Sequence, residues 1–149
     1  MRAVLTRVKE ASVAIDGEIV GQIGHGFLIL LGIGPEDSET QCKKLCEKAL
    51  GLRIFEDDAG KMNLGLSDIG GEVLVVSQFT LYGDCRKGRR PSFTGAAAPD
   101  LAIPLYERFL QLCKDAGFPP QHGQFGADMQ VSSINDGPVT LILDTDSLM

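Results

Sequence analysis

The stretch VLVVSQFTLYGD, residues 73–84, decides the fold. Its first four residues form a continuous apolar run rich in β-branched side chains, which is typical of a strand buried on both faces. The run ends in the polar residues Ser77, Gln78 and Thr80, and Phe79 lies among them. A buried hydroxyl or amide without a partner costs about 1–3 kcal/mol, and scaffolds place their chemistry at strand ends. These polar residues either cap the strand or form a functional site, and their number favours the site.

The basic loop that follows contains Arg86, Lys87, Arg89 and Arg90 within five residues. Residues 86–98 also hold Pro91 and several small residues, and this pattern predicts irregular structure. The whole chain has a net charge of −6, from 20 acidic and 14 basic residues, which argues against a protein that coats nucleic acid through bulk charge. The basic loop is therefore either a solvated loop or a local arm that contacts phosphates.

The size and composition of the chain indicate an ordinary globular protein. Its 149 residues suit one domain spanning 1–149, and 44% hydrophobic with 23% charged residues is typical of soluble folds. No apolar run approaches the roughly 20 residues that a membrane helix needs, and the N-terminus runs straight into a strand pattern without the apolar core of a signal peptide. We therefore expect a cytoplasmic protein that does not engage a membrane.

The cysteines and histidines do not indicate a metal centre. Cys42, Cys46, Cys85 and Cys113 form no CxxC pair, and the chain has only two histidines. Cys42 and Cys46 lie four residues apart on a predicted helix, a spacing at which two thiols can share a metal, but no second ligand pair accompanies them. The pattern favours reduced structural thiols, no metal and no cofactor.

Hydrophobic periodicity predicts an α+β fold. Residues 2–34 indicate a β-meander in which Asp16-Gly17 is a two-residue hairpin turn, and residues 27–33 form a second continuous apolar run, hence a central strand. The other predicted elements are a helix from Pro35-Glu36-Asp37-Ser38 to about Leu50, a short strand from Arg53, a loop over 57–71, a helix from Pro99 to about Ala116, an alternating strand from Phe125 to Ile134, and a last strand from Val139 to Leu143.

Arg7 stands inside the first predicted strand among apolar neighbours. It is either an edge-strand charge facing water or a guanidinium aimed at backbone carbonyls or a carboxyl group, since it offers five donors in a fixed fork. The residues alone leave both interpretations open.

The segment Asn135-Asp136-Gly137-Pro138-Val139-Thr140 joins the last two predicted strands. Asp-Gly and Gly-Pro are both turn signals, so the segment fits a plain hairpin turn. Pro138, however, is not required for a two-residue turn, and it deletes a ladder donor at the start of a strand. With a cis Gly137-Pro138 bond, both carbonyls would turn outward and form a rigid acceptor surface that lines a pocket with backbone alone.

Two motifs, Ser77-Gln78-Phe79-Thr80-Leu81 and the segment Asn135 to Thr140, together resemble the D-aminoacyl-tRNA deacylases of the D-tyrosyl-tRNA deacylase family. The likeness covers the whole chain, including residues 2–5, 7–8, 61–63 and 127–131. Neither motif departs from the family pattern. The resemblance implies a single-domain α+β fold with a β-barrel-like, antiparallel or mixed sheet, two main flanking helices and a homodimeric assembly.

The activity implied by this resemblance is hydrolysis of the ester bond of D-aminoacyl-tRNA, and of glycyl-tRNA mischarged on tRNA-Ala. The resemblance also implies that Gly137-Pro138 is cis, enters the active site of the other subunit and rejects L-aminoacyl groups. Arg7 matches the residue that braces this motif, and Asn135 belongs to the same substrate-binding segment. Phe125 and Met129 match positions near the terminal adenosine of the tRNA, while either side chain is equally consistent with a core position.

The catalytic residues are expected among Ser77, Gln78, Phe79 and Thr80. The sequence places no histidine beside these residues, and a hydroxyl without a general base is a weak nucleophile. We therefore expect water to attack, assisted by the substrate's 2′-hydroxyl, at an oxyanion site of backbone N–H groups near Phe79 and Thr80. The basic loop is expected to contact tRNA phosphates. The alternatives are a non-catalytic nucleic-acid-binding module and a general Ser/Thr esterase, which would need a base.

Overall fold

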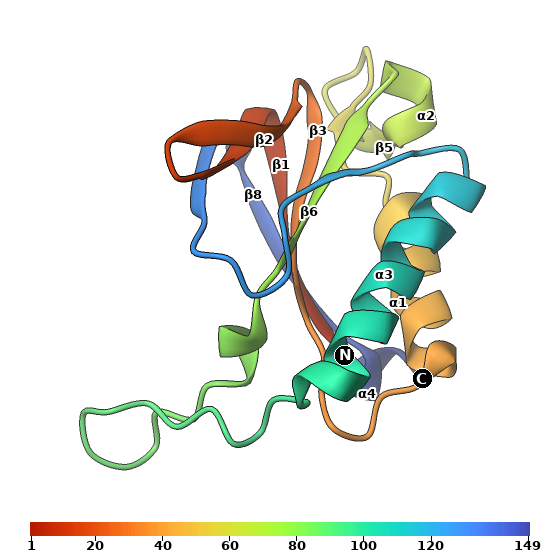
Figure 1. Ribbon diagram of the computed structural model, residues 1–149. Helices are drawn as coiled ribbons and strands as arrows, with labels where there is room; N and C mark the ends of the chain where they lie inside the picture. The colour runs from red at the N-terminus through yellow and green to blue at the C-terminus, as the bar shows by residue number, and fades with distance from the viewer.

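One strongly curved sheet forms the centre of the computed structural model, which describes residues 1–149 (Figure 1). The long first strand, β1 (Arg2–Ile15), pairs with β2 (Glu18–Ile23) and β3 (Gly26–Gly32) along one edge and with β8 (Gln130–Asp144) along the other. β6 (Glu72–Ser77) lies beside β3, and β7 (Gln121–His122) lies beside β6. The pairs are antiparallel around β1 and parallel around β6, so the sheet is mixed.

A tight turn at Asp16-Gly17 creates the β1–β2 hairpin, as the sequence predicts. Asp16 and Gly17 have φ values of 51° and 80°, and positive φ at both central residues is the requirement of a type I′ turn, whose twist matches that of paired strands. Asp and Gly tolerate this conformation better than most residues. The turn fixes the register in which Ile15 stands opposite Glu18.

The sheet curls until β2 approaches β7, which gives it the form of a nearly closed barrel. Gly21 on β2 lies against the β7 backbone, and a Cβ atom built on Gly21 would stand 2.9 Å from the His122 carbonyl oxygen. Only a residue without a side chain permits so close an approach. The prediction of a barrel-like mixed sheet in a single domain is confirmed.

The apolar run Val73 to Val76 forms the buried middle of β6, as predicted, and each of its residues is at most 2% exposed. Because successive side chains of a strand point to opposite faces, Val73 and Val75 join the larger core cluster while Leu74 and Val76 join the smaller one. β6 therefore lies between the two core clusters, and Ser77, its last residue, follows directly after the buried run.

Two helices, α1 (Glu39–Gly51) and α3 (Pro99–Asp115), lie side by side over one face of the sheet (Figure 1). α1 begins later than predicted, because Ser38 is its N-cap. The Ser38 hydroxyl accepts a hydrogen bond from Thr40 N at 3.3 Å, and the Gln41 side chain accepts one from Ser38 N at 2.8 Å, which together form a capping box. α3 matches its predicted range within a residue. No helix has both the length and the apolar character needed to cross a membrane.

Several predicted elements differ from the observed ones. The predicted loop over 57–71 contains β5 (Met62–Leu64), which pairs with β4 (Phe55–Glu56), and a helical turn, α2 (Leu66–Ile69). The strand predicted from Phe125 starts only at Gln130, because the Ala127 N–H donates to the Gln124 carbonyl at 3.1 Å and turns the chain. A short helix that the pattern missed, α4 (Thr145–Leu148), ends the chain.

The segment Asn135 to Thr140 is not a hairpin turn, so that simpler interpretation is wrong. β8 passes through it as one strand, with Asn135 opposite Val8 and Thr140 opposite Thr6 on β1. Residues 136–139, four residues of β8, therefore stand opposite a single residue of β1, Arg7. Extra residues on one strand make a bulge that pushes the chain outward. The Gly137-Pro138 peptide bond inside this β8 bulge (residues 136–139) is cis, as the resemblance implies.

Candidate active site

The end of β6 borders a pocket that contains five of the predicted site residues. Ser77, Gln78 and Phe79 contribute one part of the lining, and Phe125 and Met129, from the segment before β8, contribute another. The cavity measures about 230 Å³, and its remaining lining residues are Val76, Gly126, Ala127 and Val131. Phe125 and Met129 are half-buried, and each packs against a core cluster while it also lines the pocket. A mostly apolar pocket with a few polar groups at one end has the composition of a small-ligand site.

The residues after Ser77 form a 3₁₀ turn, η1 (Phe79–Tyr82). Its hydrogen bonds begin with Leu81 N donating to the Gln78 carbonyl at 3.2 Å, while Gln78 N donates across the sheet to Leu31 at 2.8 Å. The N–H groups of Phe79 and Thr80 stand between these bonds and have no acceptor within the turn. Two neighbouring unpaired N–H groups can stabilise a developing negative charge on an oxygen atom.

Thr80 does not line the pocket, and its hydroxyl has no general base among its partners. The Gln78 side-chain amide donates a short hydrogen bond to the Thr80 hydroxyl, and an amide N–H cannot take up a proton. The two histidines lie elsewhere: His25 contacts Asp136, and the Nδ1 atom of His122 lies 2.7 Å from the Gly123 carbonyl oxygen. This arrangement does not activate Thr80 as a nucleophile.

Arg2 holds η1 in place, a role that sequence reasoning missed. Its guanidinium donates to the Leu81 carbonyl at 3.1 Å and to the Asp144 carboxylate at 3.0 Å, and its central carbon lies 4.4 Å from the centre of the Tyr82 ring. A cation over an aromatic ring contributes about 0.5–1 kcal/mol at exposed sites. The sequence signal is only a charge at the start of a strand, and it does not reveal which segment this charge meets.

The β8 bulge presents bare backbone to its surroundings. The Asn135 side chain closes it, since Oδ1 accepts from Val139 N at 3.1 Å and Nδ2 donates to the Thr140 hydroxyl at 3.2 Å. Gly137 has a φ of 146°, and a Cβ atom there would stand 2.7 Å from Val139 Cγ2. Both Gly137 and Pro138 are exposed. The bulge therefore requires glycine and offers main-chain atoms outward.

Arg7 braces this bulge from beneath, which decides between its two interpretations. The residue is 4% exposed. Its Nε donates to the Asp136 carbonyl at 2.8 Å, one terminal nitrogen donates to the Ile54 carbonyl at 2.6 Å, and Nε lies 3.5 Å from the Asp136 carboxylate. A buried charge is tolerated when it is paired and hydrogen-bonded. The guanidinium is thus aimed at carbonyls and a carboxyl group, and the interpretation as a water-facing charge is wrong.

His25 extends the Arg7 network, and no feature of the sequence signals this. Its Nε2 lies 3.2 Å from the Asp136 carboxylate, and its ring meets the Phe55 ring edge-on at 5.1 Å. The Asp136 carboxylate thereby contacts both Arg7 and His25, while the Asp136 backbone carbonyl accepts a hydrogen bond from Arg7.

The pocket and the β8 bulge lie far apart within one chain. Ser77 pairs with Leu31, and Leu31 pairs with Ala3, whereas the bulge stands opposite Arg7. Ala3 and Arg7 are separated by about 13 Å along β1 at roughly 3.3 Å per residue, and the strands β6 and β8 by three spacings of about 4.8 Å. Gly137-Pro138 and the Ser77 pocket of the same chain are therefore not neighbours.

The basic loop projects from the body of the molecule at the lower left of Figure 1, and its four cations are not equivalent. Arg86 donates to the Asp84 carboxylate at 2.9 and 2.8 Å, and this pairing lowers the pKa of Asp84. Lys87, Arg89 and Arg90 form no ion pair. Three exposed cations therefore stand without a carboxylate partner.

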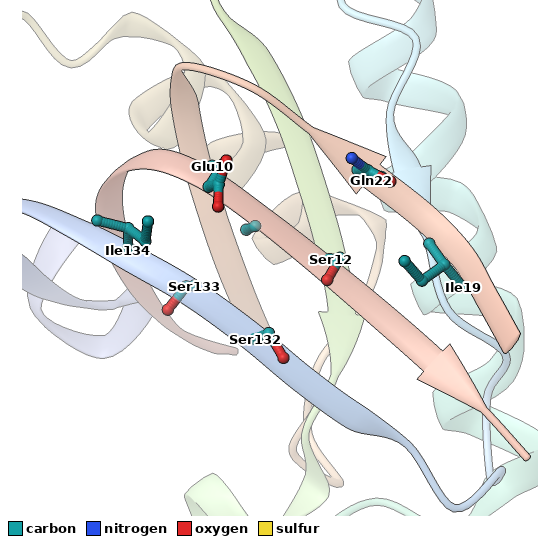
Figure 2. Close-up of a pocket in the computed structure, with 8 residues that line it drawn as sticks. Glu10, Ser12, Ile19, Gln22, Ser132, Ser133 and Ile134 are labelled. Atoms are coloured by element: carbon teal, nitrogen blue, oxygen red, sulfur yellow. The ribbon is translucent and has the colours of Figure 1, made fainter. Parts of the chain in front are cut away.

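A second hollow, of about 310 Å³, lies on the sheet formed by β1, β2 and β8 (Figure 2). It contains one carboxylate, three serines and two isoleucines, but none of the predicted site residues and no cation. Its lining is Glu10, Ala11, Ser12, Ile19, Gln22, Ser132, Ser133 and Ile134. We therefore place the candidate active site in the pocket at the end of β6.

Comparisons with known proteins identify the family. The family model described as D-Tyr-tRNA(Tyr) deacylase matches residues 4–144. Proteins named D-aminoacyl-tRNA deacylase from Thermosipho africanus and Desulfatibacillum aliphaticivorans are 58% and 59% identical to this chain over 145 residues, which cover 97% of this chain and 97% and 99% of theirs. The chain belongs to the D-Tyr-tRNA(Tyr) deacylase family, as its two motifs predict.

Solved structures agree on the fold. A protein described as c-Myc DNA Unwinding Element Binding Protein is 43% identical, with a TM-score of 0.88 over 97% of this chain and 98% of its own. A probable eukaryotic D-amino acid tRNA deacylase has a TM-score of 0.83 over 95% of this chain and 97% of its own at 18% identity. The second likeness supports the fold alone.

Proposed function

We propose that this protein, over residues 1–149, is a D-aminoacyl-tRNA deacylase of the cytoplasm. It is a hydrolase that cleaves the ester between a D-amino acid and the 3′-terminal ribose of tRNA. The observation that carries the proposal is the pocket at the end of β6, which gathers Ser77, Gln78 and Phe79 with Phe125 and Met129. Half-buried Phe125 offers an aromatic surface for the terminal adenine. Relatives with more than half of their residues identical carry the deacylase name.

The reaction we propose is attack by water, assisted by the 2′-hydroxyl of the substrate. The N–H groups of Phe79 and Thr80 stabilise the negative charge that develops on the carbonyl oxygen, and one such donor is worth roughly 10²–10³ in rate in other enzymes. Ser77 and Gln78 hold the ester and the adenosine in the attacking geometry. The lack of a base beside the Thr80 hydroxyl supports this route over a threonine nucleophile.

Handedness, in this proposal, is controlled by the main chain of Gly137-Pro138. If its carbonyls capture the α-ammonium group, the side chain of only one enantiomer can point away, and the other enantiomer drives its Cβ into the motif. Such a clash rejects by exclusion and does not depend on the identity of the side chain. Glycine has no Cβ, so glycyl-tRNA mischarged on tRNA-Ala is also hydrolysed.

The Gly137-Pro138 motif acts in the active site of a second copy of the chain. Three observations support this homodimer. Gly137-Pro138 is exposed and remote from the Ser77 pocket of its own chain. β8 pairs with β1 alone, which leaves its other edge without a partner, and open edges are pairing surfaces. Ile142 on β8 is 78% exposed, which is unusual for a large apolar side chain of a strand.

The exposed cations of the basic loop contact phosphates of the tRNA acceptor stem. Lys87, Arg89 and Arg90 provide most of this attraction, because Asp84 already neutralises Arg86. Phosphate contacts contribute affinity that decreases with salt and carries no sequence information.

The alternative is a non-catalytic nucleic-acid-binding module, and one finding favours it: the 43% identical solved structure carries a DNA-binding name. The two functions are separated by incubating the protein with D-tyrosyl-tRNA, glycyl-tRNA and L-tyrosyl-tRNA. We expect release of D-tyrosine and glycine while the L-ester stays intact. Retention of all three esters would favour the binding module, and release of both enantiomers would indicate a general esterase.

A further inference from the structure

A pair of buried thiols in the helical layer plays no part in the proposed deacylation. Cys46 on α1 and Cys113 on α3 are 4% and 0% exposed, and their sulfur atoms lie 3.8 Å apart. Both thiols are free. The two residues come from different helices, separated by 67 positions in the chain. This contact brings two nucleophilic atoms together, a feature that thiols with a packing role alone do not need.

A groove between α1 and α3 leads to one member of the pair. It measures about 600 Å³, and Cys46 lines it together with Lys43, Glu47, Leu50 and Leu112 among others. Cys113 does not belong to the lining and lies behind Cys46. A small solute that enters the groove therefore meets the Cys46 sulfur first.

The hydrogen bond between the thiols makes them unequal. It lowers the pKa of Cys46, whereas the same bond together with burial raises the pKa of Cys113. The thiolate is the reactive form of cysteine, so Cys46 is the nucleophile of the pair. Cys42, one turn earlier on α1, contrasts with it, because burial raises its pKa to about 12 and its thiol donates to the Leu105 carbonyl at 3.5 Å.

We propose that Cys46 and Cys113 form a hydrogen-peroxide-responsive site that closes reversibly into a disulfide between α1 and α3. The Cys46 thiolate attacks one oxygen of the peroxide, an S–O bond forms, the O–O bond breaks, and the departing hydroxide becomes water with the proton that the Cys46 thiol released. The Cys113 sulfur then attacks the Cys46 sulfur, an S–S bond forms, and the S–O oxygen leaves as water with the Cys113 proton. The two thiols lose two electrons in total, and the peroxide is reduced to two waters.

The position of the pair sets the consequence of this modification. The sulfurs must approach from 3.8 Å to about 2.05 Å. A disulfide protects Cys46 from irreversible conversion to the sulfinic acid. Neither cysteine lines the pocket at the end of β6, so we expect oxidation to leave D-aminoacyl-tRNA hydrolysis unchanged.

The test uses the full-length chain with Cys85→Ser, which removes the one exposed thiol and hence intermolecular cross-links. After treatment with hydrogen peroxide, mass spectrometry should show a loss of about 2 Da and a linked Cys46–Cys113 peptide, both reversed by dithiothreitol. A Cys113→Ser variant, which keeps a hydroxyl beside the Cys46 sulfur, should form no link and should gain about 32 Da at Cys46. Cys42→Ser is the matched control, and it should form the same link.

Two results would overturn the proposal. One is oxygen addition at Cys46 without a link while Cys113 is present. The other is a Cys46–Cys113 pair that stays reduced under conditions that oxidise Met62, whose 54% exposure makes it an internal gauge of peroxide reaction. Circular dichroism of each variant verifies the fold, and Cys113→Thr, which also keeps a hydroxyl, replaces Cys113→Ser if the latter does not fold.

Discussion

Replacing Arg7 by methionine tests whether the buried guanidinium holds the β8 bulge. Arg7→Met keeps a long apolar stem and removes both charged hydrogen bonds, at 2.8 Å to the Asp136 carbonyl and 2.6 Å to the Ile54 carbonyl. A hydrogen bond to a charged group contributes about 1.5–3 kcal/mol net. We expect a loss of about 3–4 kcal/mol in the free energy of unfolding, after some recovery from apolar packing. For a chain of this size, that corresponds to a fall in Tm of about 6–16 °C.

The measurement is urea unfolding at a fixed protein concentration, because assembly makes stability concentration-dependent. Arg53→Met is the matched control, since Arg53 also donates to a backbone carbonyl, that of Asn63 at 2.8 Å, but is exposed. An exposed substitution of this kind stays within about 0.5 kcal/mol. If Arg7→Met unfolds at the same urea concentration as Arg53→Met, the bracing role assigned to Arg7 is wrong.

Three further changes address the reaction itself. Thr80→Ala should retain most D-aminoacyl-tRNA turnover, and a complete loss of turnover with intact tRNA binding would instead identify a threonine nucleophile. Gly137→Ala, which places a methyl group 2.7 Å from Val139 Cγ2 at a φ of 146°, should cost about 1–3 kcal/mol of stability and release L-tyrosine from L-tyrosyl-tRNA. The double change Arg89→Ala and Arg90→Ala should weaken tRNA binding and reduce the salt slope by about 1 for each phosphate that is left without its cation, whereas an unchanged slope would mean that the basic loop is only solvated.

The buried strand and the hairpin could be predicted because their causes are local. Val73 to Val76 is apolar on both faces, so it fits only a strand covered on both sides. Asp16-Gly17 supplies the two positive φ values that its turn requires. In each case the residues that determine the structure are neighbours in the sequence.

The bulge and the Phe125 segment could not be predicted, because their structure depends on distant partners. Asp-Gly-Pro is typical of a turn, and only the pairing of β1 with the residues on both sides of it shows otherwise. The alternation from Phe125 onward is typical of a strand, yet the chain turns at Ala127 and offers Phe125 to the pocket of β6 instead. Periodicity reports which side chains share a face, but not which strand lies beside them.

The roles of the arginines also required the fold. The neighbours of Arg7 in the sequence do not decide between water and carbonyls, since its burial and its acceptors depend on Ile54 and on Asp136 of the β8 bulge, both distant in the sequence. Arg2 provides only the signal of a charge near a strand start, although it contacts both η1 and the end of β8. The sequence supplies the donors, and the tertiary structure determines their acceptors.

Arg2 and Arg7 divide the work of holding the two backbone surfaces that the proposed reaction uses. One arginine has an even and the other an odd position on β1, so their side chains lie on opposite faces of the strand. Arg2 donates to η1, the turn that carries the Phe79 and Thr80 N–H groups. Arg7 donates to the β8 bulge, which carries Gly137-Pro138. Loosening the first should weaken transition-state stabilisation, and loosening the second should weaken exclusion of the L-enantiomer. Arg2→Met is therefore expected to lower kcat for D-tyrosyl-tRNA while L-tyrosyl-tRNA stays intact, and Arg7→Met to admit L-tyrosyl-tRNA with a smaller change in kcat. The reverse pattern in a hydrolysis assay with both enantiomers would show that the two surfaces have been assigned to the wrong steps.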